Sequence, residues 1–127
     1  MSNKVKLEIE FVIRASPNFL YQYISTPDSM GEWFADNVNS RGKKFTFIWD
    51  DSEEVAVRIA QKNNEFIKFK WEEDEEKETY FEMRIQVDAL TKDVSLIVTD
   101  FADEDEVEES KMFWENQIAE LKHVIGG

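Results

Sequence analysis

The sequence predicts an α+β fold in which a seven-stranded antiparallel sheet packs against two short helices and one long C-terminal helix. Three observations support this prediction. Apolar and polar residues alternate in several segments, two proline-containing helix starts follow the first of these segments, and an apolar stripe at helical spacing runs toward the C-terminus. The 127 residues include no cysteine and suit a single domain, residues 1–127, that folds on its own hydrophobic core.

The N-terminal part of the chain predicts one strand and two short helices. Between residues 4 and 14 the odd positions from Val5 to Ile13 are apolar and most even positions are charged, as in a half-buried strand. Ser16-Pro17 and Thr26-Pro27 each combine an N-cap hydroxyl with a proline suited to the first helical position. Helical spacing then predicts buried faces that comprise Leu20, Tyr23 and Ile24 in the first helix and Met30, Trp33 and Phe34 in the second.

The middle of the chain predicts six further strands. A short strand near Val38 leads through a turn at residues 40–43, where Gly42 supplies a positive φ, into the alternating segment around Phe47. The apolar positions of the following strands are Val55, Val57 and Ile59; Ile67, Phe69 and Trp71; Phe81, Met83, Ile85 and Val87; and Val94, Leu96 and Val98. Charged residues such as Arg58, Lys70 and Arg84 occupy the alternate positions, which predicts that one sheet face contacts water.

The last predicted element is a helix from about Asp105 to Ile125. Its stripe at spacings of three and four consists of Val107, Lys111, Trp114, Ile118, Leu121 and Ile125. Acidic residues at its start favour the positive end of the helix dipole, and two glycines end it. This helix is predicted to cross the dry face of the sheet.

Composition excludes several classes of function. A formal net charge of −13 disfavours the phosphate contacts that dominate nucleic-acid binding. The sequence shows neither an apolar segment long enough to span a membrane nor the apolar core of a signal peptide, and together with the absence of cysteine this predicts a cytoplasmic protein. Thiolate metal sites and cysteine nucleophiles are excluded. The acidic segments lack the ligand spacing of a calcium loop, so we expect no metal and no cofactor.

The negative charge is concentrated in three segments. Residues 50–54, 72–78 and 100–109 carry −4, −5 and −7, so together they carry −16 and the remaining residues carry +3. In a seven-stranded meander these segments follow the third, fifth and seventh strands, which run in the same direction. They are therefore predicted to form an acidic rim at one end of the sheet. Such a rim fits a basic protein partner, although solubility alone also accounts for charge runs.

The order of these elements resembles the helix-grip fold of the START-like superfamily, also called SRPBCC or birch-pollen-allergen-like. Within it, the chain is most similar to homologues of the C-terminal domain of the heat-shock ATPase activators and to polyketide-cyclase-like proteins. The matching segments are Ser16-Pro17, Thr26-Pro27-Asp28 before Trp33-Phe34, Gly42, and Phe113-Trp114 before Leu121-Lys122. The chain differs from this pattern in having one glycine at the turn where many relatives have two, and in its acidic run before the last helix.

The resemblance implies a curved sheet around the C-terminal helix, with a cavity between them that takes an apolar small molecule. Trp33 and Phe34 are expected beside its mouth. The residues predicted to line it are Phe47, Trp49, Val57, Phe69, Trp71, Phe81, Met83, Trp114 and Ile118. The alternative is that these side chains only fill the core, as buried aromatic residues usually do.

Three functions follow from the sequence, and it does not decide between them. The first is a noncatalytic START-like domain that binds a small apolar or amphipathic ligand between the sheet and the last helix. The second is a protein-interaction module, of a chaperone-linked ATPase-regulator kind, that uses the acidic rim. The third is an enzyme, for which support is weakest, because no residue spacing forms a catalytic group and His123 is expected to point away from the sheet. No additional apolar stripe calls for a partner helix, so we expect a monomer.

Overall fold

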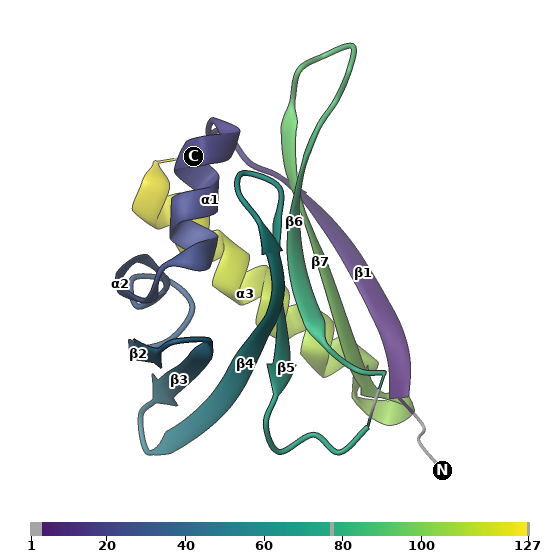
Figure 1. Cartoon of the computed structure of the whole chain (residues 1–127). Coiled ribbons are helices and arrows are strands. Elements are labelled where there is room, and N and C mark those ends of the chain that lie inside the picture. The colour runs from purple at the N-terminus through teal and green to yellow at the C-terminus, as the bar shows by residue number, and fades with distance from the viewer. Residues whose placement is uncertain (1–3, 77, 127) are drawn as a thin grey trace.

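The computed structural model describes residues 4–76 and 78–126 of the chain. These residues form a strongly curved antiparallel sheet that wraps one side of a long helix (Figure 1). The elements are β1 (Lys4–Val12), α1 (Pro17–Ser25), α2 (Pro27–Met30), β2 (Asn37–Arg41), β3 (Lys44–Trp49), β4 (Ser52–Lys62), β5 (Phe66–Trp71), β6 (Phe81–Val87), β7 (Val94–Asp103), the 3₁₀ turn η1 (Glu104–Glu106) and α3 (Val107–Ile125).

Within the described residues the sheet has seven strands in the order β1-β7-β6-β5-β4-β3-β2, so it is a meander to which the first strand is added beside the last. All neighbouring strands are antiparallel. A register shift between Arg58 and Ala60 in β4 inserts a bulge that leaves Ile59 51% exposed, and bulges increase the local twist of a strand. The predicted fold class is confirmed.

The two short helices begin as the prolines predict, but their caps differ. The Ser16 hydroxyl accepts a hydrogen bond from the Phe19 amide at 3.4 Å, and Pro17 opens α1. The Thr26 hydroxyl instead donates to the Gln22 carbonyl at 2.9 Å, so it does not cap α2. The predicted extension of this second helix to Phe34 is wrong, because α2 ends at Met30 and residues 31–35 form a turn.

The core lies between the concave face of the sheet and α1, the 31–35 turn and α3 (Figure 1). The predicted stripe of α3 supplies its buried residues Trp114, Ile118 and Leu121. The opposite sheet face carries charged side chains, with ion pairs such as Lys44 to Glu72 at 3.2 Å. Burial of the apolar face is what fixes the helix to the sheet.

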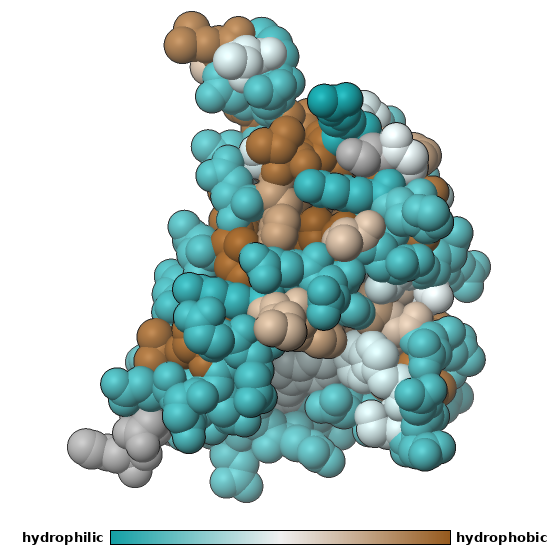
Figure 2. Space-filling view, turned by 180° about the vertical axis from the view of Figure 1, so that it is seen from behind, coloured by the Kyte–Doolittle hydropathy of each residue, from teal (hydrophilic) through white to brown (hydrophobic). Residues whose placement is uncertain are grey.

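Figure 2 shows a mostly hydrophilic face on the side opposite to Figure 1, with one projecting end that carries hydrophobic atoms. That end is the hairpin between β6 and β7, where Leu90 is 92% exposed. None of the helices in the described part of the chain combines the length and apolar character that a membrane span requires.

Candidate functional site

A cluster of aromatic side chains occupies the space between the sheet and α3, and Phe34 is at its centre. The Phe34 side chain is fully buried. Its ring centroid lies 5.1 to 6.2 Å from those of Trp33, Phe47, Trp49, Phe81, Phe113 and Trp114. Such separations are typical of packed aromatic pairs. The cluster therefore connects the 31–35 turn, strands β3 and β6, and α3 through one side chain.

Hydrogen bonds fix the orientation of three tryptophans in this cluster. The Trp33 indole N–H donates to the Tyr23 carbonyl at 2.8 Å, and that of Trp49 donates to the Phe34 carbonyl at 2.9 Å. The Trp114 indole N–H donates to Oδ2 of Asp100 at 2.8 Å. Because a buried indole N–H without a partner is costly, each bond restricts its ring to one position.

The structure brings together most of the residues that were predicted to line a cavity. Those buried on the concave side are Phe47, Phe69, Phe81, Met83, Trp114 and Ile118. Trp49 and Trp71 are half-buried at the edge of the cluster. Trp33 and Phe34, which were expected beside the mouth of a cavity, are both buried: Trp33 is 4% exposed, and the turn after α2 carries Phe34 into the middle of the core.

The predicted inward orientation of Val57 is wrong. Val57 pairs with Lys44 and Lys70 on the outer face, while Ala56 pairs with Phe45 and Trp71 on the concave face. The cause is the two-residue turn at residues 50–51, where Trp49 pairs with Ser52. Directly paired residues share a face, so this turn places the even-numbered residues at the start of β4 on the inside.

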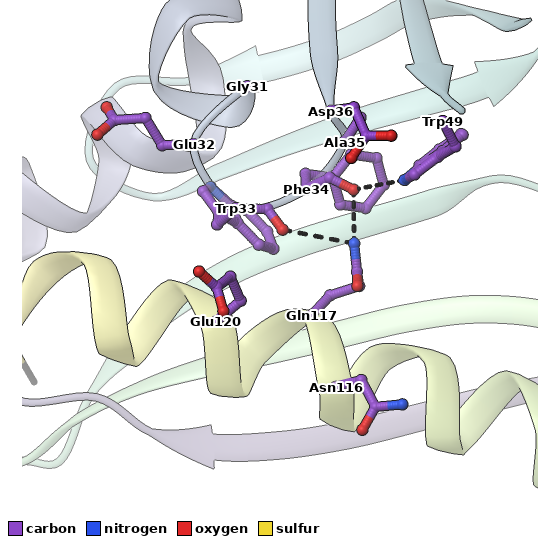
Figure 3. A pocket seen from close by; sticks show the side chains of 10 residues that line it. All are labelled: Gly31, Glu32, Trp33, Phe34, Ala35, Asp36, Trp49, Asn116, Gln117 and Glu120. Atoms are coloured by element: carbon purple, nitrogen blue, oxygen red, sulfur yellow. Dashed lines mark hydrogen bonds between the residues drawn. The ribbon is translucent and has the colours of Figure 1, made fainter. Parts of the chain in front are cut away.

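An open groove of about 470 Å³ lies where the 31–36 segment faces α3 (Figure 3). It is lined by Gly31, Glu32, Trp33, Phe34, Ala35, Asp36, Trp49, Asn116, Gln117 and Glu120. Trp33, Phe34 and Trp49 belong to both the groove and the aromatic cluster. The groove is thus the place where the cluster reaches the surface.

Gln117 closes the floor of this groove. Its side-chain amide donates to the Phe34 carbonyl at 2.5 Å and to the Trp33 carbonyl at 3.4 Å, which bridges α3 and the 31–35 turn (Figure 3). Sequence reasoning missed this residue. The available signal was its place beside the apolar stripe, one position before Ile118, but the carbonyls that it contacts are distant in sequence.

Asp100 is a carboxylate within the apolar side of the sheet. Its Oδ1 accepts a hydrogen bond from the Phe101 amide at 2.7 Å, in addition to the bond from Trp114. Burial raises the pKa of Asp100 above its ordinary value of 3.8, although these two hydrogen bonds and the charge of Lys4 oppose the shift. Asp100 therefore fixes the position of the Trp114 ring, and when Asp100 is charged its burial costs free energy.

The three acidic segments gather at one end of the sheet, as predicted. Glu54 and residues 73–76 line one hollow of about 480 Å³ there, and Asp103, Glu106 and Glu109 line another of about 310 Å³. Lys4 lines both hollows. In Figure 1 this end carries the start of β1, the β3–β4 and β5–β6 connections and the start of α3. We call it the acidic end.

Lys70 fixes the acidic connection between β5 and β6. Its ammonium group donates to the Thr79 hydroxyl at 2.7 Å, to the Thr79 carbonyl at 2.9 Å and to the Glu76 carbonyl. Asp74 accepts hydrogen bonds from the Thr79 hydroxyl and the Glu76 amide. Burial alone would raise the pKa of Asp74, but these bonds and the charge of Lys70 lower it below its ordinary value.

The titratable side chains that line the groove are carboxylates. His123 is exposed on α3, as the helical spacing predicted. Across residues 4–76 and 78–126, His, Asp and Glu side chains form no group of three that could hold a metal ion. The groove thus combines aromatic side chains with hydrogen-bond acceptors.

Comparison with solved structures finds the same fold in several proteins. BfR322 from Bacteroides fragilis is 36% identical, with a TM-score of 0.67 over 97% of this chain and 92% of that chain. The Aha1 dimer from Colwellia psychrerythraea is 15% identical, with a TM-score of 0.77 over 93% of each chain. DynU16, from the dynemicin biosynthetic locus, is 14% identical with a TM-score of 0.76; the match covers 99% of this chain but 48% of DynU16.

A comparison with curated protein sequences found no match. A family model does match: that of the START-like superfamily domain, over residues 1–127. The meander, the short helices and the long C-terminal helix agree with that match. The chain therefore belongs to the START-like superfamily.

Proposed function

We propose that this protein is a noncatalytic binding domain that holds a small apolar or amphipathic molecule between the sheet and α3. The observation that carries the proposal is the continuity of the aromatic cluster with the groove. The ring centroid of Phe34 lies 5.6 Å from that of Trp114 in the interior and 5.5 Å from that of Trp49 at the groove. An apolar ligand that displaces some of these ring contacts would therefore be surrounded by aromatic side chains from the groove to the interior.

Access to the interior requires movement of a side chain, because the rings are packed against one another. Gln117 and Phe34 are the elements that would move. Within the described part of the chain, the Gln117 side chain makes two hydrogen bonds, both to backbone carbonyls and each worth about 1 kcal/mol in net stability. Phe34 is carried by the 31–35 turn, outside any helix or strand. Opening at this place exposes the cluster without breaking a strand pair.

A binding titration with octanol tests the proposal, with tryptophan fluorescence as the readout. We expect saturable binding by the wild type and about tenfold weaker binding by Trp71→Ala, because this substitution removes a large aromatic contact surface on the concave face. Phe66→Ala is the matched control, since Phe66 lies on the outer face of the same strand. Circular dichroism confirms that each variant is folded.

Two results of this titration contradict the proposal. One is the absence of saturable binding to the wild type. The other is an equal loss of affinity in Trp71→Ala and Phe66→Ala, which would place the effect outside the concave face.

The Gln117 bridge should also limit the association rate of octanol. Gln117→Ala should therefore have a higher association rate than the wild type. Asn116→Ala should not, because the Asn116 side chain points away from the Gln117 bridge (Figure 3).

A second candidate function is an interaction between the acidic end and a basic protein segment. The convergence of Glu54, residues 73–76 and Asp103 at one end favours it, because like charges held together attract a basic partner. Binding of a lysine- and arginine-rich peptide should weaken as salt rises and should weaken in Glu73→Gln/Glu75→Gln. Glu8→Gln/Glu10→Gln on β1 is the control with the same change in charge. Binding that is insensitive to salt would contradict this candidate.

A further inference from the structure

The charged residues that line the groove beside Gln117 are all acidic. Its charged lining residues are Glu32, Asp36 and Glu120, and none of the lining residues is basic. Among the described residues, no ion pair neutralises any of these three carboxylates. The groove therefore presents negative charge beside the aromatic surface of Trp33 and Trp49.

The groove has few hydrogen-bond donors to offer a ligand. The backbone amides of residues 31–35 donate to carbonyls of residues 27–30, and the amide of Asp36 donates to the Ile48 carbonyl. The side-chain donors of Trp49 and Gln117 are both directed to the Phe34 carbonyl. The Asn116 side-chain amide is the remaining donor of the lining, so an anionic headgroup, such as a carboxylate or phosphate, would meet one amide and three carboxylates here.

Two of the three carboxylates are well placed to meet a ligand that enters the groove. Glu120 points from α3 toward Trp33, whereas Glu32 points away from the Gln117 bridge (Figure 3). Asp36 lies on the wall beside Trp49, and one of its oxygens accepts a hydrogen bond from the Asp50 amide at 2.7 Å. Within the described residues, the second oxygen of Asp36 and both oxygens of Glu120 accept no hydrogen bond from the protein, which leaves acceptors for a cation.

We propose that the ligand of this groove carries a positively charged amine or quaternary ammonium headgroup next to its apolar part, with Glu120 and Asp36 as its counter-charges. This inference rests on the proposed function and names the ligand class. Carboxylates of the lining and the half-buried indole of Trp49 both attract positive charge, so they would favour a cation in the groove. The apolar chain follows Trp33 and Phe34 toward the aromatic cluster.

Three probes with the same chain and different headgroups test the inference by calorimetry: octyltrimethylammonium, octanol and octanoate. We expect the cation to bind about tenfold more tightly than octanol, and octanoate to bind most weakly, since two partly exposed carboxylates and a cation–π contact each contribute modestly. Glu120→Gln and Asp36→Asn should each reduce the cation-to-octanol preference by about threefold.

A control separates this site from general attraction by an acidic protein. Glu115→Gln changes the net charge by the same amount on the same helix, but Glu115 does not line the groove, so it should leave the preference unchanged. An equal loss of preference in Glu115→Gln and Glu120→Gln would overturn the inference. Equal binding of all three probes would also overturn it while leaving the proposed function intact. Binding of none would overturn both.

Discussion

Asp100 shows how one side chain couples the charge of the molecule to the packing of its site. It holds the Trp114 indole and lies in a place where burial raises its pKa above 3.8. The folded state therefore binds this proton more tightly than the unfolded chain does. As a consequence, the free energy of unfolding contributed by Asp100 falls as pH rises from about 3.8 through the folded-state pKa, and is constant above it.

The first prediction compares Asp100→Asn with the wild type in urea unfolding at several pH values. Asparagine does not titrate and keeps one acceptor for Trp114. The free energy of unfolding of Asp100→Asn, relative to that of the wild type, should therefore increase as the pH rises from 3.8 through the raised pKa of the folded protein. Parallel pH dependences of the two proteins would show that Asp100 titrates in the folded protein as it does in the unfolded chain.

At the scale of elements, β4 shows how a turn decides which residues reach the site. The apolar residues Val55, Val57 and Ile59 led to the wrong prediction of which β4 side chains face α3. The number of residues in the 50–51 turn decides which side chains of β4 face α3. Ala56 occupies the buried position opposite Phe45. A small inward residue allows the aromatic rings of β3 and β5 to meet across β4, where Phe45 and Phe69 lie 5.0 Å apart.

The second prediction follows from this assignment. Ala56→Leu should lower the free energy of unfolding by about 1–3 kcal/mol, since it adds volume to a fully buried position among aromatic rings. Val57→Leu is the matched control on the outer face and should change stability by less than about 0.5 kcal/mol. Urea unfolding measures both. A larger effect of Val57→Leu would contradict the observed register.

The third prediction concerns the β5–β6 connection. Lys70→Met should destabilise the protein by about 1–3 kcal/mol, because the carbonyl and hydroxyl of the buried Thr79 lose their charged donor. Lys6→Met makes the same change at an exposed strand position and serves as the control. Hydrogen exchange should show faster exchange in residues 72–80 of Lys70→Met alone. Equal protection in both variants would mean that Lys70 does not fix this connection.

At the scale of the whole molecule, the acidic end concentrates like charges from segments that are distant in sequence. Asp103, Glu106 and Glu109 line the same hollow, and the pKa of Glu106 is raised by its contact with Asp103 and by neighbouring carboxylates. Close carboxylates repel one another in the folded state more than in an expanded chain. Repulsion between the carboxylates of the acidic end therefore lowers the free energy of unfolding.

The fourth prediction is that salt stabilises the protein. Raising NaCl from about 0.02 M to about 0.3 M should increase the free energy of unfolding by roughly 0.5–1 kcal/mol, because screening weakens repulsion between surface charges. Glu106→Gln should show a smaller increase than the wild type, while Glu10→Gln on β1 should not differ from it. A stability that is independent of salt would show that repulsion at the acidic end is negligible.

Much of the architecture could be predicted from the sequence, because local patterns determine it. Alternation identified the strands, and the stripe of Trp114, Ile118 and Leu121 identified the helix that covers them. The acidic end followed from the direction of the strands. What could not be predicted depends on contacts between distant segments. The end of α2 at Met30, the bridge from Gln117 to the Phe34 carbonyl and the bond from Trp114 to Asp100 leave no local pattern.

Uptake of an apolar molecule by the aromatic cluster, through the groove beside Gln117, should change the surroundings of individual tryptophans. Proton–nitrogen correlation spectra recorded during titration with octyltrimethylammonium and with octanol detect this change, because each tryptophan indole gives its own signal. We predict saturable shifts of the Trp33, Trp49 and Trp114 indole signals and of backbone amides in residues 31–36, with little change in the β6–β7 hairpin. Shifts confined to that hairpin, or none with either molecule, would contradict such uptake.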